Sequence, residues 1–168
     1  MYSIGDVVAY GTTGVCRIDG ECEQKAKDGV RKYLVLKPMH QANSTVYVPM
    51  DNENLMAKLK KLLTREDIEN IISAAADEEA EWISNDTERV TKFREILNSG
   101  DRYQLMRMVR VLYKQQCKRF SSGKRLHASD ETLFREAERI LFDEFAVVLG
   151  IPTDKVMDFI AQKFGEVK

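Results

Sequence analysis

The chain has 168 residues, 43% of them hydrophobic, and a formal net charge of −1. This length accommodates one ordinary domain or two small ones, and no apolar run approaches the roughly 18 residues of a membrane span. The N-terminus MYSIGDVVAYG lacks a basic region followed by an apolar one, and three scattered cysteines form no disulfide framework. We therefore expect a cytoplasmic protein that is neither secreted nor membrane-embedded.

Residues 1–50 carry the pattern of short β-strands. The segments VVAYG, GVCRIDGEC, KYLVLKP and STVYVPM are rich in valine and tyrosine, and turn residues separate them. No helical pattern intervenes, which predicts a small antiparallel barrel or a strongly bent sheet. The domain boundary falls within residues 51–63, where LMAKLKKLL suits either neighbour.

From residue 64 onward the apolar residues recur with helical spacing. Thr64-x-x-Asp67 resembles a capping box, with Asp in place of the usual Glu. The expected helix starts are the cap signals Thr64, Asn85, Asp101, Ser129 and Thr153. The sequence therefore predicts an α+β protein, with a small antiparallel β-barrel at residues 1–60 and a bundle of about five helices at residues 61–168.

The charges are segregated along the chain. Residues 65–88 contain nine acidic residues and one basic residue, whereas residues 102–127 contain eight basic residues and no acid. On a wheel at 100° per residue, one arc of about 80° opposite the apolar stripe holds four cations. These are Arg107, Arg110, Lys114 and Lys118, and the loop SSGKRLH adds Lys124 and Arg125.

This basic face has two interpretations. A solvated outer face is the ordinary one, but such faces normally mix Glu with Lys for i,i+4 pairs. The missing acids and the adjoining basic loop favour contact with nucleic acid. Because the whole chain is not basic, we expect weak and salt-sensitive DNA binding, which becomes useful when a second module tethers the protein nearby.

Motifs of enzymatic or metal chemistry are missing from the sequence. HExxH, CxxC, GxSxG and GxxxxGK[ST] do not occur, and the two histidines lie in different halves. We therefore expect no catalytic residues, no metal ligands, no cofactor and no small-molecule substrate.

Five segments, in this order, carry a family likeness: IGDVVAYGTTGVCRI, KYLVLKP, STVYVPMDN, ILNSGDRYQLMRMVRVLYKQQ and SSGKRLHASDETLFREAERILFDEFAVVLGI. Together they resemble the CarD/CdnL family of bacterial transcription regulators over residues 1–150. The resemblance implies a Tudor-like N-terminal domain that docks on the β subunit of RNA polymerase by sheet-edge pairing. It also implies a helical domain that contacts promoter DNA at the upstream edge of the transcription bubble.

The resemblance places the polymerase contact on the strand TVYVP and on the hairpin before it. The implied residues are Gln24, Lys25, Val46, Tyr47 and Pro49. Many family members carry arginine at the positions of Gln24 and Tyr47, so here the polar part of the contact must differ, with Lys25 or Arg31 as substitutes. The alternative for Tyr47 is an ordinary surface aromatic of the barrel.

The resemblance also implies a tryptophan that wedges into the minor groove and supports the opened duplex. Counted back from Gly100, the family tryptophan falls at about Asp86, whereas the only tryptophan is Trp82. We take Trp82 as the candidate wedge, with Arg89 and Lys92 as neighbouring DNA-binding residues. The alternative is that Trp82 packs in the bundle, and a fully buried ring would exclude the wedge.

These observations predict a non-enzymatic regulator of transcription initiation. It would tether to the RNA polymerase β subunit, contact promoter DNA and stabilise the open complex, in the cytoplasm and at the nucleoid through the polymerase. The alternative is a protein–protein adaptor with no direct DNA contact.

Overall fold

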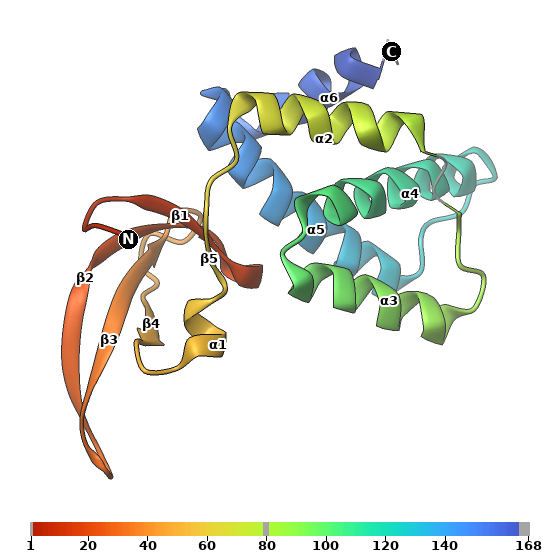
Figure 1. Cartoon of the computed structure of the whole chain (residues 1–168). Helices are drawn as coiled ribbons and strands as arrows, with labels where there is room; N and C mark the ends of the chain where they lie inside the picture. The colour runs from red at the N-terminus through yellow and green to blue at the C-terminus, as the bar shows by residue number, and fades with distance from the viewer. Residues whose placement is uncertain (1, 79–80, 165–168) are drawn as a thin grey trace. The chain divides into compact units, whose positions relative to one another are not determined.

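The computed structural model describes residues 2–78 and 81–164, and the chain divides into two compact units, Met1–Leu62 and Leu63–Lys168 (Figure 1). The first unit is built on a sheet and the second on helices. In the described ranges, no helix combines the length and the apolar character needed to cross a membrane.

The first unit is a five-stranded antiparallel sheet. Its strands are β1 (Val7–Tyr10), β2 (Gly14–Ala26), β3 (Gly29–Pro38), β4 (Val46–Pro49) and β5 (Leu59–Lys61). Their order is β4-β3-β2-β1-β5, so β4 and β5 are the edges and strand pairing does not close a barrel. A register shift between Ile18 and Gly20 marks a bulge in β2, and bulges bend the bulged strand.

One face of this sheet holds a small core. Alternate residues of the strands are fully buried there, including Val8, Ile18, Leu36 and Val48. The short 3-10 helix η1 (Gly11–Thr13) joins β1 to β2, and the short helix α1 (Glu53–Met56) packs against the same core. Because β5 pairs with β1, the ambiguous segment LMAKLKKLL contributes a strand to the first unit.

The second unit is a helical bundle. Its elements are α2 (Arg65–Asp77), α3 (Asp86–Ser99), α4 (Arg102–Ser121), α5 (Ala128–Leu149), η2 (Thr153–Lys155) and α6 (Val156–Phe164). Residues on α4 and α5 dominate the core, and the fully buried ones include Leu112, Leu141 and Phe145. The predicted fold class, α+β with a small antiparallel β domain followed by a bundle of about five helices, is confirmed.

Three of the expected helix caps are confirmed. The side chains of Thr64, Asn85 and Asp101 each accept a hydrogen bond from a backbone N–H three residues later. The prediction of Ser129 as a cap is wrong, because α5 begins at Ala128 and its N-cap is His127, which makes no side-chain capping hydrogen bond. Thr153 begins the 3-10 turn η2, and α6 follows directly.

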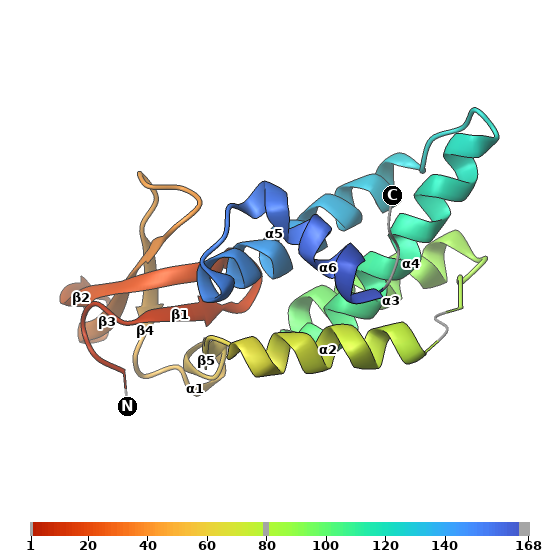
Figure 2. The same cartoon turned by 90° about the horizontal axis from the view of Figure 1, so that it is seen from above.

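Two helix starts meet at one end of the bundle. Arg89, near the start of α3, donates to Asp130, near the start of α5, and the loop after α4 leads directly into α5. Figures 1 and 2 show that loop at the same end as the start of α3. The segment with Trp82 and the loop with Lys124 therefore belong to the same end. The end of α2 lies against the middle of α4, where Arg110 donates to Ala76 O.

Replacing Thr64 with alanine is expected to lower the free energy of unfolding of the helical unit by about 1 kcal/mol, the usual effect of losing an N-cap. Thr64 Oγ1 accepts from Asp67 N at 3.1 Å, and Asp67 Oδ2 accepts from Thr64 N at 2.8 Å. Urea unfolding followed by the fluorescence of Trp82 measures the loss. The exposed Thr87→Ala is the control, and an equal loss there would contradict the cap.

The same capping pair makes the stability depend on pH. Hydrogen bonds from the backbone and side chain of Thr64 lower the pKa of Asp67 below its ordinary value of 3.8. A carboxyl group whose pKa is lower in the folded state stabilises that state when the pH is above the pKa of the unfolded chain. This contribution is lost as the pH falls through the pKa of the folded state. We expect Asp67→Asn to remove this part of the acid sensitivity in unfolding curves measured below pH 4.

Candidate functional site

The edge strand β4 presents unpaired main-chain groups on one side. Val48 pairs with Leu34 of β3, and beyond the strand Met50 N donates to Lys32 O at 3.0 Å. Antiparallel partners alternate between hydrogen-bonded and non-hydrogen-bonded pairs. Residues 46 and 48 therefore bond to β3, and Tyr47 directs its N–H and C=O toward the open edge.

The side chains of Tyr47 and Pro49 lie on the outer face of the sheet, opposite its core. The ring of Tyr33 on β3 meets that of Tyr47 edge to face, with centroids 6.5 Å apart. Further along the β2–β3 hairpin, Gln24 pairs with Arg31, and the strand alternation puts both on this face. The face therefore combines two aromatic rings, a proline, an amide and a guanidinium.

Two of the predicted polymerase-binding residues lie elsewhere. Val46 is half-buried and packs against the sheet core. Lys25 follows Gln24 directly, so it points to the opposite face near the hairpin tip. Of the two cations considered from the sequence, Arg31 shares the face of Gln24, and its Nε lies 3.1 Å from Asp51 Oδ2.

Trp82 lies in the connection between α2 and α3, before the N-cap Asn85. Its ring is partly buried, with the guanidinium of Arg89 4.3 Å from the ring centroid. The ring of Phe93 packs beside it, with centroids 6.5 Å apart. Trp82 is therefore a partly buried aromatic that packs against the edge of the bundle core and is held by a cation–π contact, and it is not fully buried.

Arg89 is buried, so the prediction that it contacts DNA is wrong. Only 1% of the residue is exposed, and its Nε and Nη2 donate to the two carboxylate oxygens of Asp130 at 2.9 and 2.7 Å. It also donates to Ile83 O and to Asp86 Oδ1. The hydrogen bonds to Asp130 raise the pKa of Arg89. Its charge is satisfied inside the bundle, where it positions Trp82.

Arg107 and Arg110, also predicted to bind DNA, are engaged with the C-terminus of α2. Arg110 Nη1 donates to the carbonyls of Ala75, Ala76 and Glu78, and Arg107 Nε lies 3.4 Å from Glu78 Oε2. The last turn of α2 has no basic residue of its own. Cations there satisfy the end carbonyls and the helix dipole. Half of the predicted basic stripe therefore holds α2 against α4.

The other predicted cations of this region are exposed on the last turns of α4 and on the loop that follows it, and we call them the basic cluster: Lys114, Lys118, Lys124 and Arg125. Arg119 ties the loop to the end of α4, because its Nε donates to Arg125 O and its carbonyl accepts from Lys124 N, both at 2.8 Å. Lys92 is exposed on α3, one turn beyond Arg89. In residues 2–78 and 81–164, no three side chains of metal-ligand type gather.

Sequence reasoning missed two residues of this end of the bundle. Asp130 is fully buried as the partner of Arg89. The sequence feature that could have identified it is an acidic residue in the first turn of a long helix. Phe120 is 80% exposed on α4, next to the basic cluster. Its signal was a large aromatic directly after Lys118 and Arg119.

Comparison with known families accounts for both units. The profile of the CarD-like/TRCF RID domain matches residues 2–60, and that of the CarD C-terminal domain matches residues 67–161. A comparison with curated proteins found no match. The two profiles match in the order that the resemblance implies and span nearly the whole chain. The chain therefore belongs to the CarD family of RNA polymerase-interacting transcription regulators.

Proposed function

We propose that this protein bridges RNA polymerase and promoter DNA and thereby stabilises the open complex, without catalysis of its own. The first unit would be the tether to the β subunit, and the helical unit would contact DNA at the upstream edge of the bubble. One observation carries this proposal: Arg89 contacts the partly buried Trp82 and bonds to Asp130 at the start of α5, directly after the loop that holds Lys124 and Arg125, in a chain whose other unit is of the polymerase-interacting type.

The tether would form by strand addition at β4. In this mode, main-chain hydrogen bonds supply affinity and alternate side chains supply specificity. The outward N–H and C=O of Tyr47 would provide the main-chain bonds. The rings of Tyr33 and Tyr47, with Gln24 and Arg31 further along the hairpin, would meet the side chains of the added strand. Val46 and Lys25 would support this contact only indirectly.

The DNA contact would combine a minor-groove wedge with phosphate binding. Trp82 would press its exposed part against an unstacked base step, as apolar wedges do in the minor groove. The basic cluster and Lys92 would neutralise nearby phosphates. With only a few such contacts the free protein binds weakly, but the tether raises the effective concentration of the helical unit to about millimolar.

Replacing Tyr47 with proline is expected to weaken binding to an isolated fragment of the β subunit about tenfold or more, because one main-chain hydrogen bond and the contacts of the ring are lost. Proline removes the outward N–H but none of the hydrogen bonds to β3, and edge strands accept it in such positions. Isothermal calorimetry with the full chain measures the affinity.

Two controls interpret that result. Tyr47→Ala removes the ring but keeps the backbone donor, so we expect it to bind the fragment more tightly than Tyr47→Pro does. Circular dichroism of Tyr47→Pro establishes that the sheet is retained. If Tyr47→Pro binds the fragment as tightly as the wild type, then the strand does not add at β4.

A further inference from the structure

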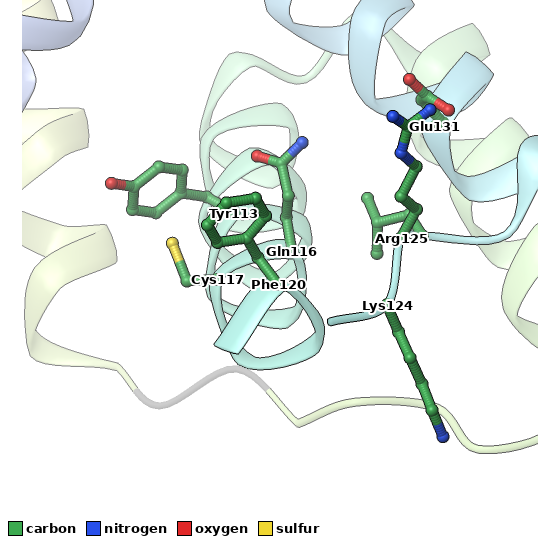
Figure 3. A pocket seen from close by; sticks show the side chains of 8 residues that line it. Tyr113, Gln116, Cys117, Phe120, Lys124, Arg125 and Glu131 are labelled. Atoms are coloured by element: carbon green, nitrogen blue, oxygen red, sulfur yellow. The ribbon is translucent and has the colours of Figure 1, made fainter. Parts of the chain in front are cut away.

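A pocket of about 420 Å³ adjoins the basic cluster at the C-terminal end of α4 (Figure 3). The lining comes from α4, from the loop that follows it and from the start of α5. Its apolar part consists of Tyr113, Cys117, Phe120 and Leu126, and its cations are Lys124 and Arg125. Binding sites for small ligands measure about 300–1,000 Å³, so this volume suits a ligand of modest size.

Phe120 is the most exposed large apolar side chain described in the structure, at 80%. Tyr113, Cys117 and Phe120 are spaced by four and then three residues, which places them on one face of α4. This face continues beyond the part of α4 that is buried in the core, whose last fully buried residue is Leu112. The aromatic strip is therefore not needed to fill the bundle.

Two cations lie on the loop beside this apolar strip. Figure 3 shows Lys124 extending away from the pocket, while Arg125 points toward Glu131 at the start of α5. The one acid in the lining is Glu131, whose Oε1 accepts from Arg135 Nη2 at 2.7 Å. An aromatic surface with cations beside it suits a ligand that has a flat π-system and a neighbouring negative charge.

We propose that this pocket receives one unpaired nucleobase from a single-stranded segment of DNA. The base would stack on Phe120, and an adjoining phosphate would meet Lys124. Aromatic platforms beside basic residues bind single strands in this way, whatever the sequence. Bases of a duplex are already stacked and cannot enter. The inference rests on the proposed function and adds a single-strand contact to it.

Cys117 provides a local probe of the pocket. Its thiol is free and exposed, Cys16 is buried and Cys22 lies in the first unit. In the full-length Cys22→Ser variant, the alkylation rate of Cys117 by iodoacetamide therefore reports pocket occupancy. We expect a forked DNA with a short unpaired segment, or a strand of twelve deoxythymidines, to slow alkylation about fivefold when four-fifths of the protein is bound. A paired duplex should slow it much less.

Substitution of Phe120 tests the stacking directly. Phe120→Ala should weaken fork binding about fivefold or more, the effect of one lost base–aromatic stack, and leave duplex binding unchanged. Phe120→Tyr should retain fork binding. Val147→Ala removes another exposed apolar side chain, from α5, and should have no effect. Because Phe120 is exposed, we expect its substitution to leave the fold unchanged.

The outcomes separate this inference from the proposed function. If the wild type binds duplex but neither fork nor single strand protects Cys117, the pocket assignment alone is overturned. It is also overturned if Phe120→Ala binds the fork normally, or if polyglutamate protects Cys117 better than DNA does, which would indicate an acidic peptide ligand. If the wild type binds no DNA at all, the proposed function fails together with the pocket.

Discussion

Replacing Arg89 with alanine is expected to lower the free energy of unfolding of the helical unit by about 3–5 kcal/mol, the usual cost of breaking a buried ion pair. The change leaves the carboxylate of Asp130 buried without its two strongest donors. It also removes the guanidinium that holds the ring of Trp82. Urea unfolding followed by circular dichroism at 222 nm measures the loss.

Two further variants make that experiment decisive. Lys92→Ala changes an exposed cation on the same helix and should alter the stability by less than about 0.5 kcal/mol. The double variant Arg89→Met with Asp130→Leu replaces the pair with apolar side chains, which is often neutral, so it should be more stable than Arg89→Ala. A loss below 1 kcal/mol for Arg89→Ala would show that Arg89 is not a structural residue.

Reversing the basic cluster is expected to abolish measurable DNA binding. Each phosphate contact adds about 0.9 to the slope of log affinity against log salt, so four lost contacts lower the affinity about a thousandfold or more at 0.1 M salt. The variant carries Lys114→Glu, Lys118→Glu, Lys124→Glu and Arg125→Glu. Fluorescence anisotropy with a labelled promoter duplex, over a series of salt concentrations, gives both the affinity and the slope.

Arg107 and Arg110 are left out of this variant because both contact the end of α2. Reversal of Arg107 and Arg110 would remove the cations that satisfy the end of α2, so lost binding could reflect lost structure. A control with the same change of net charge reverses four exposed lysines of the first unit: Lys25, Lys27, Lys32 and Lys58. It should bind duplex nearly as the wild type does. Equal DNA binding by all three proteins would favour the adaptor without DNA contact.

The overall fold was accessible from the sequence because its signals are local. The alternation of side chains in TVYVP and the caps at Thr64, Asn85 and Asp101 depend on neighbours within a few residues. The assignment of β5 to the sheet was not accessible in this way, because a three-residue strand is defined only by its pairing with β1. Ser129 failed as a cap because α5 starts two residues earlier than its local signals indicate.

The candidate site was only partly accessible, for a related reason. A helical wheel places Arg107, Arg110 and Lys114 together, but it does not show that α2 ends beside the first two. The partner of Arg89 lies 41 residues further along the chain, so a cation that looks solvent-facing in the sequence is buried in the fold. The sequence gives the charge of a side chain, but it does not show whether a group on another helix neutralises that charge.

The lifetime of the open complex is the measurement that tests the bridging function most directly. RNA polymerase and one promoter are assembled with the wild type, Tyr47→Pro, Trp82→Ala or the reversed basic cluster, and dissociation is followed after a competitor is added. We expect the wild type to prolong the lifetime and each variant to return it toward that of polymerase alone. A wild type without effect, or variants that prolong the lifetime as much as the wild type does, would contradict the proposal.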